Sequence, residues 1–272
     1  MTVLHRTMTK ADLGLALSWA ADEGWNPGVE DAEPFYAADP EGFFVAELNG
    51  QPVAAISVVN HTDTLAFLGL YICRPEHRGQ GIGLGLWTHA VRHAGSRTIG
   101  LDGVPDQQAN YEASGFRHTG QTRRFEGRIG GDRHSDIRLA TPSDIPHLSA
   151  LEATATGYAK NRLNAAWLAQ ADTRQTLCLG ERAFATWRKC QGRSKIGPLV
   201  APDLDTATVL ILHIAALAPD GIVIDLPQHM GPLAKWCEDR GLTVSFGTAR
   251  MYKGKAPQPG RDLFAVSTLE LG

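Results

Sequence analysis

The sequence predicts an α/β protein built from two tandem domains of one fold, each a mixed sheet flanked by helices. Three observations support this prediction. The chain has 272 residues, which suits two domains of ordinary size. Strand-like and helix-like segments follow one another over residues 2–115 in the order βα, ββ, βαβα. The pattern at the start of the chain then begins again in the second half.

The elements of the first half can be placed from hydrophobic period and from turn residues. Strands are expected at 2–7, 42–50, 51–61, 64–73 and 98–103, and helices at 9–24, 81–95 and 106–115. Thr9 is the expected N-cap of the first helix. Asn49-Gly50 is a hairpin turn signal, and Gly115 suits the C′ position after the last helix.

The segment 127–136 has the glycine and charge content of a linker, and the residues after it match the beginning of the chain. RTMTKADL at 6–13 corresponds to RLATPSDI at 138–145, and YEASGF at 111–116 corresponds to CEDRGL at 237–242. We therefore expect two divergent copies of one fold, with domains at residues 1–128 and 132–272.

The composition of the chain limits the classes of ligand it can bind and the compartment in which it can work. The chain has 26 basic and 29 acidic residues, so it lacks the basic excess typical of nucleic-acid binding. Its four cysteines form no CxxC pair, which argues against a disulfide framework or a zinc knuckle and fits a reducing cytoplasm. The longest apolar run, at 209–218, is too short to cross a membrane. We expect a cytoplasmic protein that binds small molecules and contacts neither membrane nor nucleic acid.

Four alternating glycines follow the buried strand and begin the next helix, at positions 79, 81, 83 and 85. A helix start of this kind presents unpartnered backbone N–H groups at the positive end of the helix dipole, which favours an anion such as phosphate. A P-loop is excluded because no lysine occurs between positions 10 and 160. A dinucleotide-binding fingerprint does not match the glycine spacing. A glycine-rich helix start that serves only tight packing stays as an alternative.

The pattern Arg-x-x-Gly-x-Gly at 78–83 resembles the diphosphate loop of the GCN5-related N-acetyltransferase (GNAT) family. Two further features follow that family's order. LYICRP at 70–75 stands where the family has the end of its fourth strand, with a bulge that pairs with the pantetheine arm, and NYEASGF at 110–116 stands at its Tyr-x-x-x-Gly-Phe helix end. The resemblance implies mostly antiparallel sheets and acetyl-CoA held by Ile72, Cys73, Arg78, Gly79, Gln80, Gly81, Ile82, Gly83, Asn110 and Tyr111.

More narrowly, the chain resembles a tandem subgroup of that family. Its marks here are WNPG at 25–28, RMY at 250–252 and TLELG at 268–272. This likeness extends over the whole chain and implies no particular substrate.

Transfer of an acetyl group to an amine requires the amine to lose a proton and the departing thiolate to gain one. The resemblance implies Tyr111 as the general acid, the alternative being a ring that only packs. It also implies main-chain donors near Ile72 and Cys73 for the oxyanion, with the Cys73 side chain inert. For the general base, Glu23 is our first choice and Asp102 our second, with ordinary surface or capping carboxylates and a bound water as alternatives.

Two histidines, His89 and His93, share one helix face but lack a third ligand, so we expect them to be solvated and predict no metal.

The second copy departs from the family pattern at the cofactor loop. At the position of the cofactor loop it has DLDTATVLILH, residues 203–213, which contains no glycine and places Asp203 and Asp205 where phosphates would lie. In addition, Cys237 stands at the position that corresponds to Tyr111. Like charge opposes diphosphate binding, and a helix start without glycine cannot approach it closely. We expect the second copy to be structural, closing the sheet of the first copy or walling its acceptor pocket.

The expected function is therefore acetyl-CoA-dependent N-acetylation of a primary amine, on a small molecule or a peptide, by residues 1–128. The competing class is a non-catalytic acetyl-CoA sensor or scaffold. The oligomeric state is left open, a homodimer included.

Overall fold

The computed structural model describes residues 3–272, and a single sheet of 13 strands runs through both halves of the chain. The strands are β1 (Val3–Thr7), β2 (Phe43–Leu48), β3 (Gln51–Asn60), β4 (Leu65–Cys73), β5 (Thr98–Gly103), β6 (Arg117–Gly127), β7 (Ile137–Leu139), β8 (Arg174–Leu179), β9 (Ala183–Lys189), β10 (Ser194–Val200), β11 (Ile222–Pro227), β12 (Thr243–Lys253) and β13 (Leu263–Ala265). The helices are α1 (Lys10–Asp22), α2 (Ala32–Ala38), α3 (Ile82–Ala90), α4 (Gln108–Ala113), α5 (Ile145–Thr156), α6 (Asn161–Trp167), α7 (Leu204–Leu217) and α8 (Gly231–Asp239).

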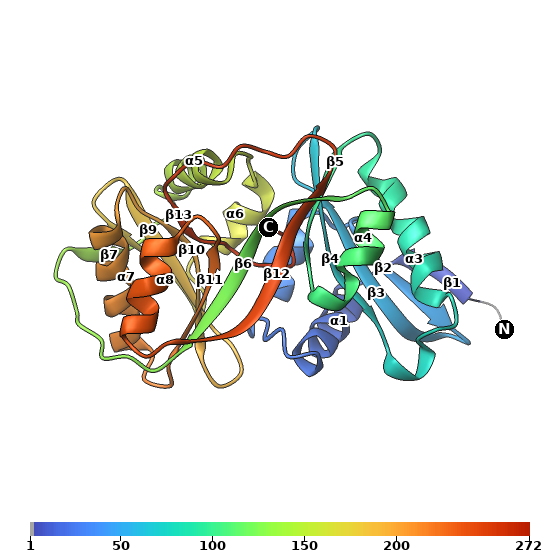
Figure 1. Cartoon of the computed structure of the whole chain (residues 1–272), viewed down its shortest axis with the longest axis horizontal. Helices are drawn as coiled ribbons and strands as arrows, with labels where there is room; N and C mark the ends of the chain where they lie inside the picture. Colours follow the sequence, from blue (N-terminus) through green and yellow to red (C-terminus); the bar gives the residue numbers. More distant parts are fainter. Residues whose placement is uncertain (1–2) are drawn as a thin grey trace.

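The strand order is β1-β2-β3-β4-β5-β12-β6-β11-β10-β9-β8-β7, with β13 added alongside β10. Among the described strands, β4 with β5 and β10 with β11 are the parallel pairs, and the other pairs are antiparallel. Helices flank the sheet in both halves (Figure 1). The predicted fold class, two tandem domains with mixed and mostly antiparallel sheets, is confirmed.

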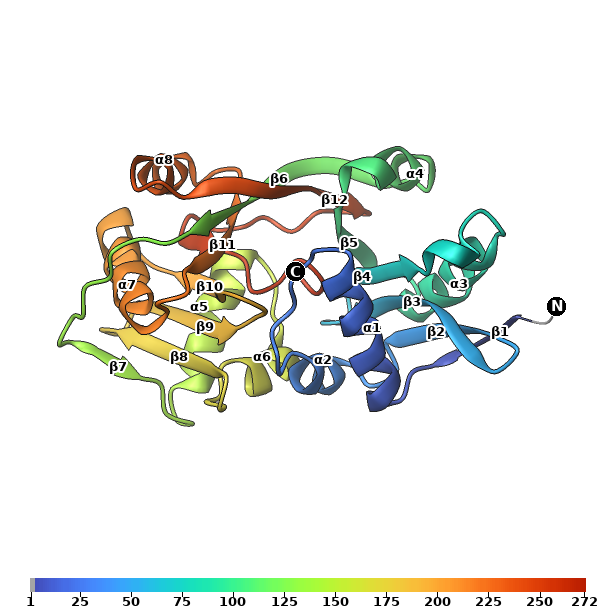
Figure 2. The ribbon, with the colours of Figure 1, turned by 90° about the horizontal axis from the view of Figure 1, so that it is seen from below.

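The two halves exchange strands where they meet. Strand β12, from the second half, pairs with β5 of the first half, while β6, from the first half, pairs with β11 of the second. The exchanged strands also pair with each other, and both views show them crossing side by side between the two halves (Figures 1 and 2). Each half therefore completes its sheet with a strand of the other. The second copy closes the sheet of the first, as expected, whereas the reciprocal pairing of β6 with β11 was not predicted.

Local signals in the sequence mark the element ends where they were expected. Thr9 caps α1 and accepts a hydrogen bond from the Asp12 N–H. Asn49 and Gly50 both have positive φ, as a two-residue hairpin turn requires, and Gly115 has φ +92° just after α4. The helix expected at 81–95 ends as α3 at Ala90 and continues as a 3₁₀ turn, and the short helix α2 was not predicted. Thr2, expected to begin the first strand, lies outside the described residues.

A hydrophobic core joins the two halves on one face of the sheet. It includes residues of α1 and α2 from the first half and of α5 and α6 from the second. The rings of Phe35 and Trp167, both fully buried, stack across this boundary with centroids 5.9 Å apart. Leu271, also fully buried, brings the end of the chain into the same core. The halves thus share one apolar interior on this face.

Both copies carry a bulge at the same place in the fold. Opposite β3, strand β4 has one extra residue at Leu70–Tyr71, and Leu70 has φ +47°. Opposite β9, strand β10 has its extra residue at Gly197–Pro198. The matching bulges agree with duplication of one fold, and they mark where the fourth strand of each copy turns from its parallel neighbour.

Candidate active site

The candidate site lies where β4 and β5 separate. The two strands pair from Leu65 to Leu68, and β4 then bulges away. Arg74 N–H donates to Val53 O of β3. Hydrogen-bonded pairs alternate along an antiparallel ladder, so Ile72 is the next residue of β4 whose main chain bonds to β3, at Ala55. The main-chain N–H and C=O of Cys73, between them, therefore face the gap between β4 and β5. A groove of about 450 Å³ begins there and extends to the start of α3.

The start of α3 has free backbone donors. Its N-cap is Gly81, with φ +77°, and no side chain caps the helix. Gly79 also has positive φ, and a Cβ at either glycine would meet only open space. Gly83 differs, because a Cβ there would lie 2.9 Å from the Tyr71 hydroxyl. Gly79 and Gly81 thus leave the backbone open toward the groove, whereas Gly83 allows close packing against Tyr71.

Arg78 connects this loop to two other elements. Its Nε donates to Cys73 O at 2.8 Å, and its Nη2 donates to Glu23 Oε1 at 2.5 Å. Glu23 follows directly after α1, so the ion pair joins the end of that helix to the loop. The first-choice base therefore lies in the groove, already paired with the loop arginine.

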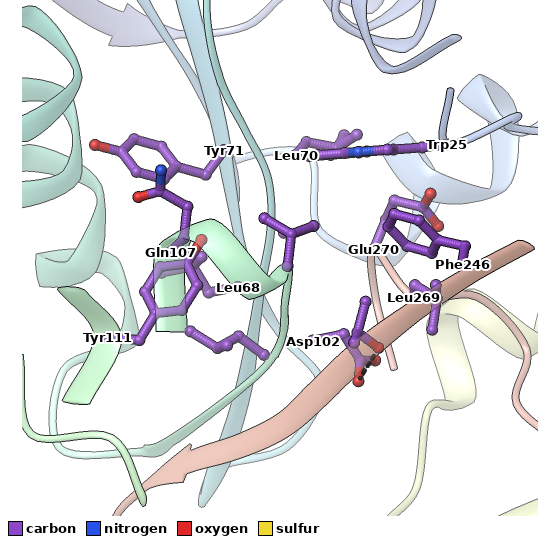
Figure 3. A pocket seen from close by; sticks show the side chains of 14 residues that line it. Trp25, Leu68, Leu70, Tyr71, Asp102, Gln107, Tyr111, Phe246, Leu269 and Glu270 are labelled. Carbon is purple, nitrogen blue, oxygen red and sulfur yellow. Dashed lines mark hydrogen bonds between the residues drawn. The ribbon is translucent and has the colours of Figure 1, made fainter. Parts of the chain in front are cut away.

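Tyr111 lies on α4 with its ring almost fully buried. The ring stacks on Trp87 with centroids 5.6 Å apart, and it also lines an inner cavity beside Gln107 (Figure 3). Burial raises the pKa of Tyr111, which keeps the phenol neutral at physiological pH. The residue thus combines a packing role with access to the cavity.

Asp102, the second-choice base, lies near the end of β5 with its side chain fully buried. Its two carboxylate oxygens accept hydrogen bonds from Arg250 Nε at 2.9 Å and Nη2 at 2.6 Å. Burial raises the pKa of Asp102, and the Arg250 guanidinium opposes that rise. The carboxylate is thus held and neutralised by a residue of the second half.

The inner cavity encloses about 60 Å³ and has walls from both halves of the chain. Figure 3 shows Trp25 of the first half at the same end of the cavity as Phe246, Leu269 and Glu270 of the second, with Tyr71 and Tyr111 at the other end. Sequence reasoning missed Tyr71, Phe246 and Glu270 as site residues. Glu270 lies in the TLELG segment, whose likeness to the tandem subgroup was the one available signal.

The WNPG segment, which brings Trp25 to the cavity, is held by hydrogen bonds from β6, from β10 and from the turn before β10. Trp25 O accepts from Arg124 Nη1 at 3.0 Å and from Lys195 Nζ at 3.2 Å. Asn26 Oδ1 accepts from Gln191 N–H at 3.0 Å. The position of this cavity wall therefore depends on contacts with β6 and with the second half.

The groove brings together most residues that the family resemblance nominated: Glu23, Ile72, Cys73, Arg78, Gly79, Gly81, Ile82 and Gly83. Asp102 and Tyr111 line the inner cavity, and Asn110 lines a third cavity beside Tyr111. Gln80 instead donates its side-chain amide to Glu76 O at 3.1 Å. Tyr71 lines all three cavities and so stands at their junction.

His89, on α3, and His93, on the turn after it, are half-buried, so the expectation that they are solvated holds only in part. Both pack against Phe44, and His93 Nε2 lies 2.8 Å from Asp39 Oδ2. Within residues 3–272, no group of three His, Cys, Asp or Glu side chains could hold a metal ion. No helix in the same range is long and apolar enough to cross a membrane.

The corresponding region of the second copy is closed in two ways. Asp203 caps α7, accepting from Thr206 N–H at 2.8 Å, so a carboxylate occupies the helix start that is free in the first copy. Strand β13 lies against β10, pairing with Leu199 and Val200 just after the bulge. The chain itself thus fills the opening that in the first copy forms the groove.

Comparison with known proteins identifies the family. Residues 13–116 match the model of the acetyltransferase (GNAT) family, and residues 148–265 match that of an acetyltransferase (GNAT) domain. The chain is 32% identical to a holothin acyltransferase from Pseudoalteromonas sp. (strain SANK 73390), over 98% of this chain and 96% of that protein.

Solved structures show the same tandem fold. A putative acetyltransferase from Pyrococcus horikoshii superposes with a TM-score of 0.85 at 19% identity, over 99% of this chain and 96% of that one. A tandem GNAT protein from the clavulanic acid biosynthesis pathway superposes with a TM-score of 0.61 at 13% identity, over 92% and 98% of the two chains. Proteins of this family use acetyl-CoA and act on amine-bearing substrates. The chain therefore belongs to the GNAT family as a tandem GNAT protein, and it is an acyltransferase.

Proposed function

We propose that the domain of residues 1–128 transfers an acetyl group from acetyl-CoA to a primary amine of a small molecule or peptide. The observation that carries this proposal is the uncapped start of α3 beside the opening between β4 and β5. The second copy has neither feature, because Asp203 caps α7 and β13 fills the strand opening. We therefore assign residues 132–272 a structural role, without a cofactor of their own.

The residues present fit the diphosphate and pantetheine of coenzyme A. The amides that follow Gly79 and Gly81 are open to the groove, and the Arg78 guanidinium is half exposed beside them, where it can pair with phosphate. The main chain of Cys73 can pair with an extended ligand as it would with another strand. Acetyl-CoA supplies the activated acyl group, and these residues orient it.

For the chemistry, we propose Tyr111 as the acid that protonates the departing thiolate, since its phenol is neutral and reaches the cavity. Glu23 and Asp102 are the bases that the sequence nominated. Each is in an ion pair, Glu23 with Arg78 and Asp102 with Arg250. The four cysteines are free thiols, which supports our placing the enzyme in the cytoplasm.

Thiol release from acetyl-CoA with a panel of amines tests this proposal. Holothin is a first acceptor to include, because the relative that matches nearly the whole chain is named for it. We expect thiol release that depends on the amine. Tight binding of coenzyme A without transfer to any acceptor would instead favour the sensor or scaffold.

A further inference from the structure

We propose that Glu270, in the tail after β13, binds the acceptor's ammonium group and takes its proton. This inference rests on the proposed function and names its acceptor class: a small primary alkylamine, cationic near neutral pH, with a flat apolar body. The argument depends on where the tail runs, on which carboxylates of the site are already paired, and on the walls of the inner cavity.

The tail leads from the second half into the first. Val266 N–H donates to Asp225 O at 3.1 Å, next to β11. Farther along, the main chain of Glu270 lies against Gly69 of β4, so closely that a Cβ at Gly69 would collide with it. The Leu271 carbonyl then lies 2.7 Å from His61 Nε2. Figure 2 shows the end of the chain between the two halves, so Glu270 is fixed on both sides at the bulged part of β4.

Glu270 differs in charge pairing from the other two carboxylates considered for the chemistry. Glu23 pairs with Arg78, and Asp102 pairs with Arg250. Glu270 is only 4% exposed, yet it forms no ion pair with any residue in the range 3–272. Its side-chain carboxylate accepts a hydrogen bond from the Thr268 hydroxyl. A buried carboxylate without a cation is unfavourable, and an incoming ammonium would remove that penalty.

Arg124 interacts electrostatically with Glu270, but its guanidinium already has other partners. Arg124, on β6, donates from Nε and Nη2 to the two Asp225 carboxylate oxygens at 2.7 and 3.0 Å. Its Nη1 donates to Trp25 O, and its guanidinium stacks over the Phe246 ring at 5.1 Å. Arg124 therefore shapes the wall beside Glu270, while its charge is balanced by Asp225.

The rest of the cavity suits a small apolar body. Trp25 and Phe246 bring two aromatic rings to the end where Glu270 lies, and Leu70 and Leu269 add aliphatic surface (Figure 3). Aromatic faces favour flat apolar groups. The cavity volume of about 60 Å³ favours a small acceptor over a bulky one in the inner part of the site.

The proposed step balances. The Glu270 carboxylate takes one proton from the ammonium and leaves a neutral amine. The amine lone pair forms a C–N bond to the acyl carbon, and the C–S bond breaks as Tyr111 donates its phenolic proton to the sulfur. The remaining excess proton on nitrogen returns to the tyrosinate, and Glu270 releases its proton to water.

Two probe amines of similar shape separate this role from a structural one. Benzylamine is cationic near neutral pH, whereas aniline is uncharged there. Loss of a charged hydrogen-bond partner in Glu270→Gln should lower kcat/KM for benzylamine by about 10- to 100-fold. The kcat/KM for aniline and the affinity for coenzyme A should stay nearly unchanged. Glu270→Asp, which keeps the charge, should retain more benzylamine activity than Glu270→Gln.

Glu238→Gln makes the same chemical change on the exposed face of α8 and is the matched control. Equal losses for both amines, or a Glu270→Gln enzyme that behaves like the control, would overturn the inference. Failure of the wild type to acetylate benzylamine counts against the inference alone, because the wider amine panel tests the proposed function separately. If Glu270→Gln no longer binds coenzyme A, the inference is tested instead by competitive inhibition of the wild-type enzyme. Benzylammonium should bind at least about tenfold tighter than benzyl alcohol. Equal binding of the two would overturn the inference.

Discussion

Arg250, on β12 of the second half, holds both carboxylate oxygens of Asp102, on β5 of the first half. This pair exists because the two halves exchange strands, which places β12 directly beside β5. Asp102 lines the inner cavity, so a residue from the second half neutralises a charge in the wall of the candidate site. The second half thereby contributes to the electrostatics of the first.

Arg250→Met should strongly destabilise the protein. The change leaves the Asp102 carboxylate buried without a partner, and removal of one member of a buried ion pair costs about 3–5 kcal/mol in the free energy of unfolding. Urea unfolding measures this loss. Arg128→Met, which breaks an exposed pair with Asp220, is the control and should change stability by less than about 1 kcal/mol. Adding Asp102→Asn to Arg250→Met should restore part of the loss, and no restoration would argue against an uncompensated charge as its cause.

His61 should make stability depend on pH in the mildly acidic range. Burial lowers the pKa of His61 from 6.5 to about 4. As pH falls from about 6.5 toward 4, the unfolded chain binds a proton that the folded chain does not, so the free energy of unfolding decreases. His61→Gln should reduce this slope by up to about 1.4 kcal/mol per pH unit. Urea midpoints at several pH values test this, with exposed His118→Gln as the control, and an unchanged slope in His61→Gln would contradict it.

The parts of the fold that depend on neighbouring residues could be predicted from the sequence. The Thr9 cap, the Asn49-Gly50 turn and the position of Gly115 each follow from a side chain or a φ angle acting within a few residues. The glycines at the start of α3 could be predicted for the same reason, because their role depends on the local backbone. Helix α2 escaped prediction because it is seven residues long and contains Pro34.

The parts that depend on distant contacts could not be predicted. An alternating pattern shows that β6 and β12 are strands, but it does not show which of the two fifth strands, β5 or β11, each one joins. Glu270 reaches the cavity because the tail crosses β4 at Gly69, about 200 positions away in the sequence. The pairing of His93 with Asp39 is likewise a contact between separate elements.

Tyr111→Phe should lower kcat by roughly 10- to 1000-fold, since it removes a general acid. Affinity for coenzyme A should stay nearly intact, because the ring still stacks on Trp87. Steady-state kinetics and calorimetry measure the two effects. Tyr36→Phe, on α2, removes a hydroxyl from the same residue type outside the three cavities and should leave kcat as it is. A wild-type kcat in Tyr111→Phe would remove this residue from the mechanism.

A fragment of residues 1–130 should aggregate or lose activity. It lacks β12, so β5 loses a neighbour and β6 loses both of the strands that it pairs with. Co-expression with residues 131–272 should restore a soluble complex, because each piece supplies the strand that the other lacks. Size-exclusion chromatography and thiol release test both outcomes. A soluble, monomeric 1–130 fragment with wild-type coenzyme A affinity and turnover would show that the halves are independent.

The stoichiometry of coenzyme A binding tests the central claim most directly. Calorimetric titration of the full chain should give one site, because only the first copy combines free amides at a helix start with an open strand gap. Gly81→Asp should abolish that site through its negative charge, whereas Gly192→Asp, at a turn with the same φ of +77°, should bind normally. Two equivalent sites per chain, or wild-type coenzyme A binding by Gly81→Asp, would contradict the account.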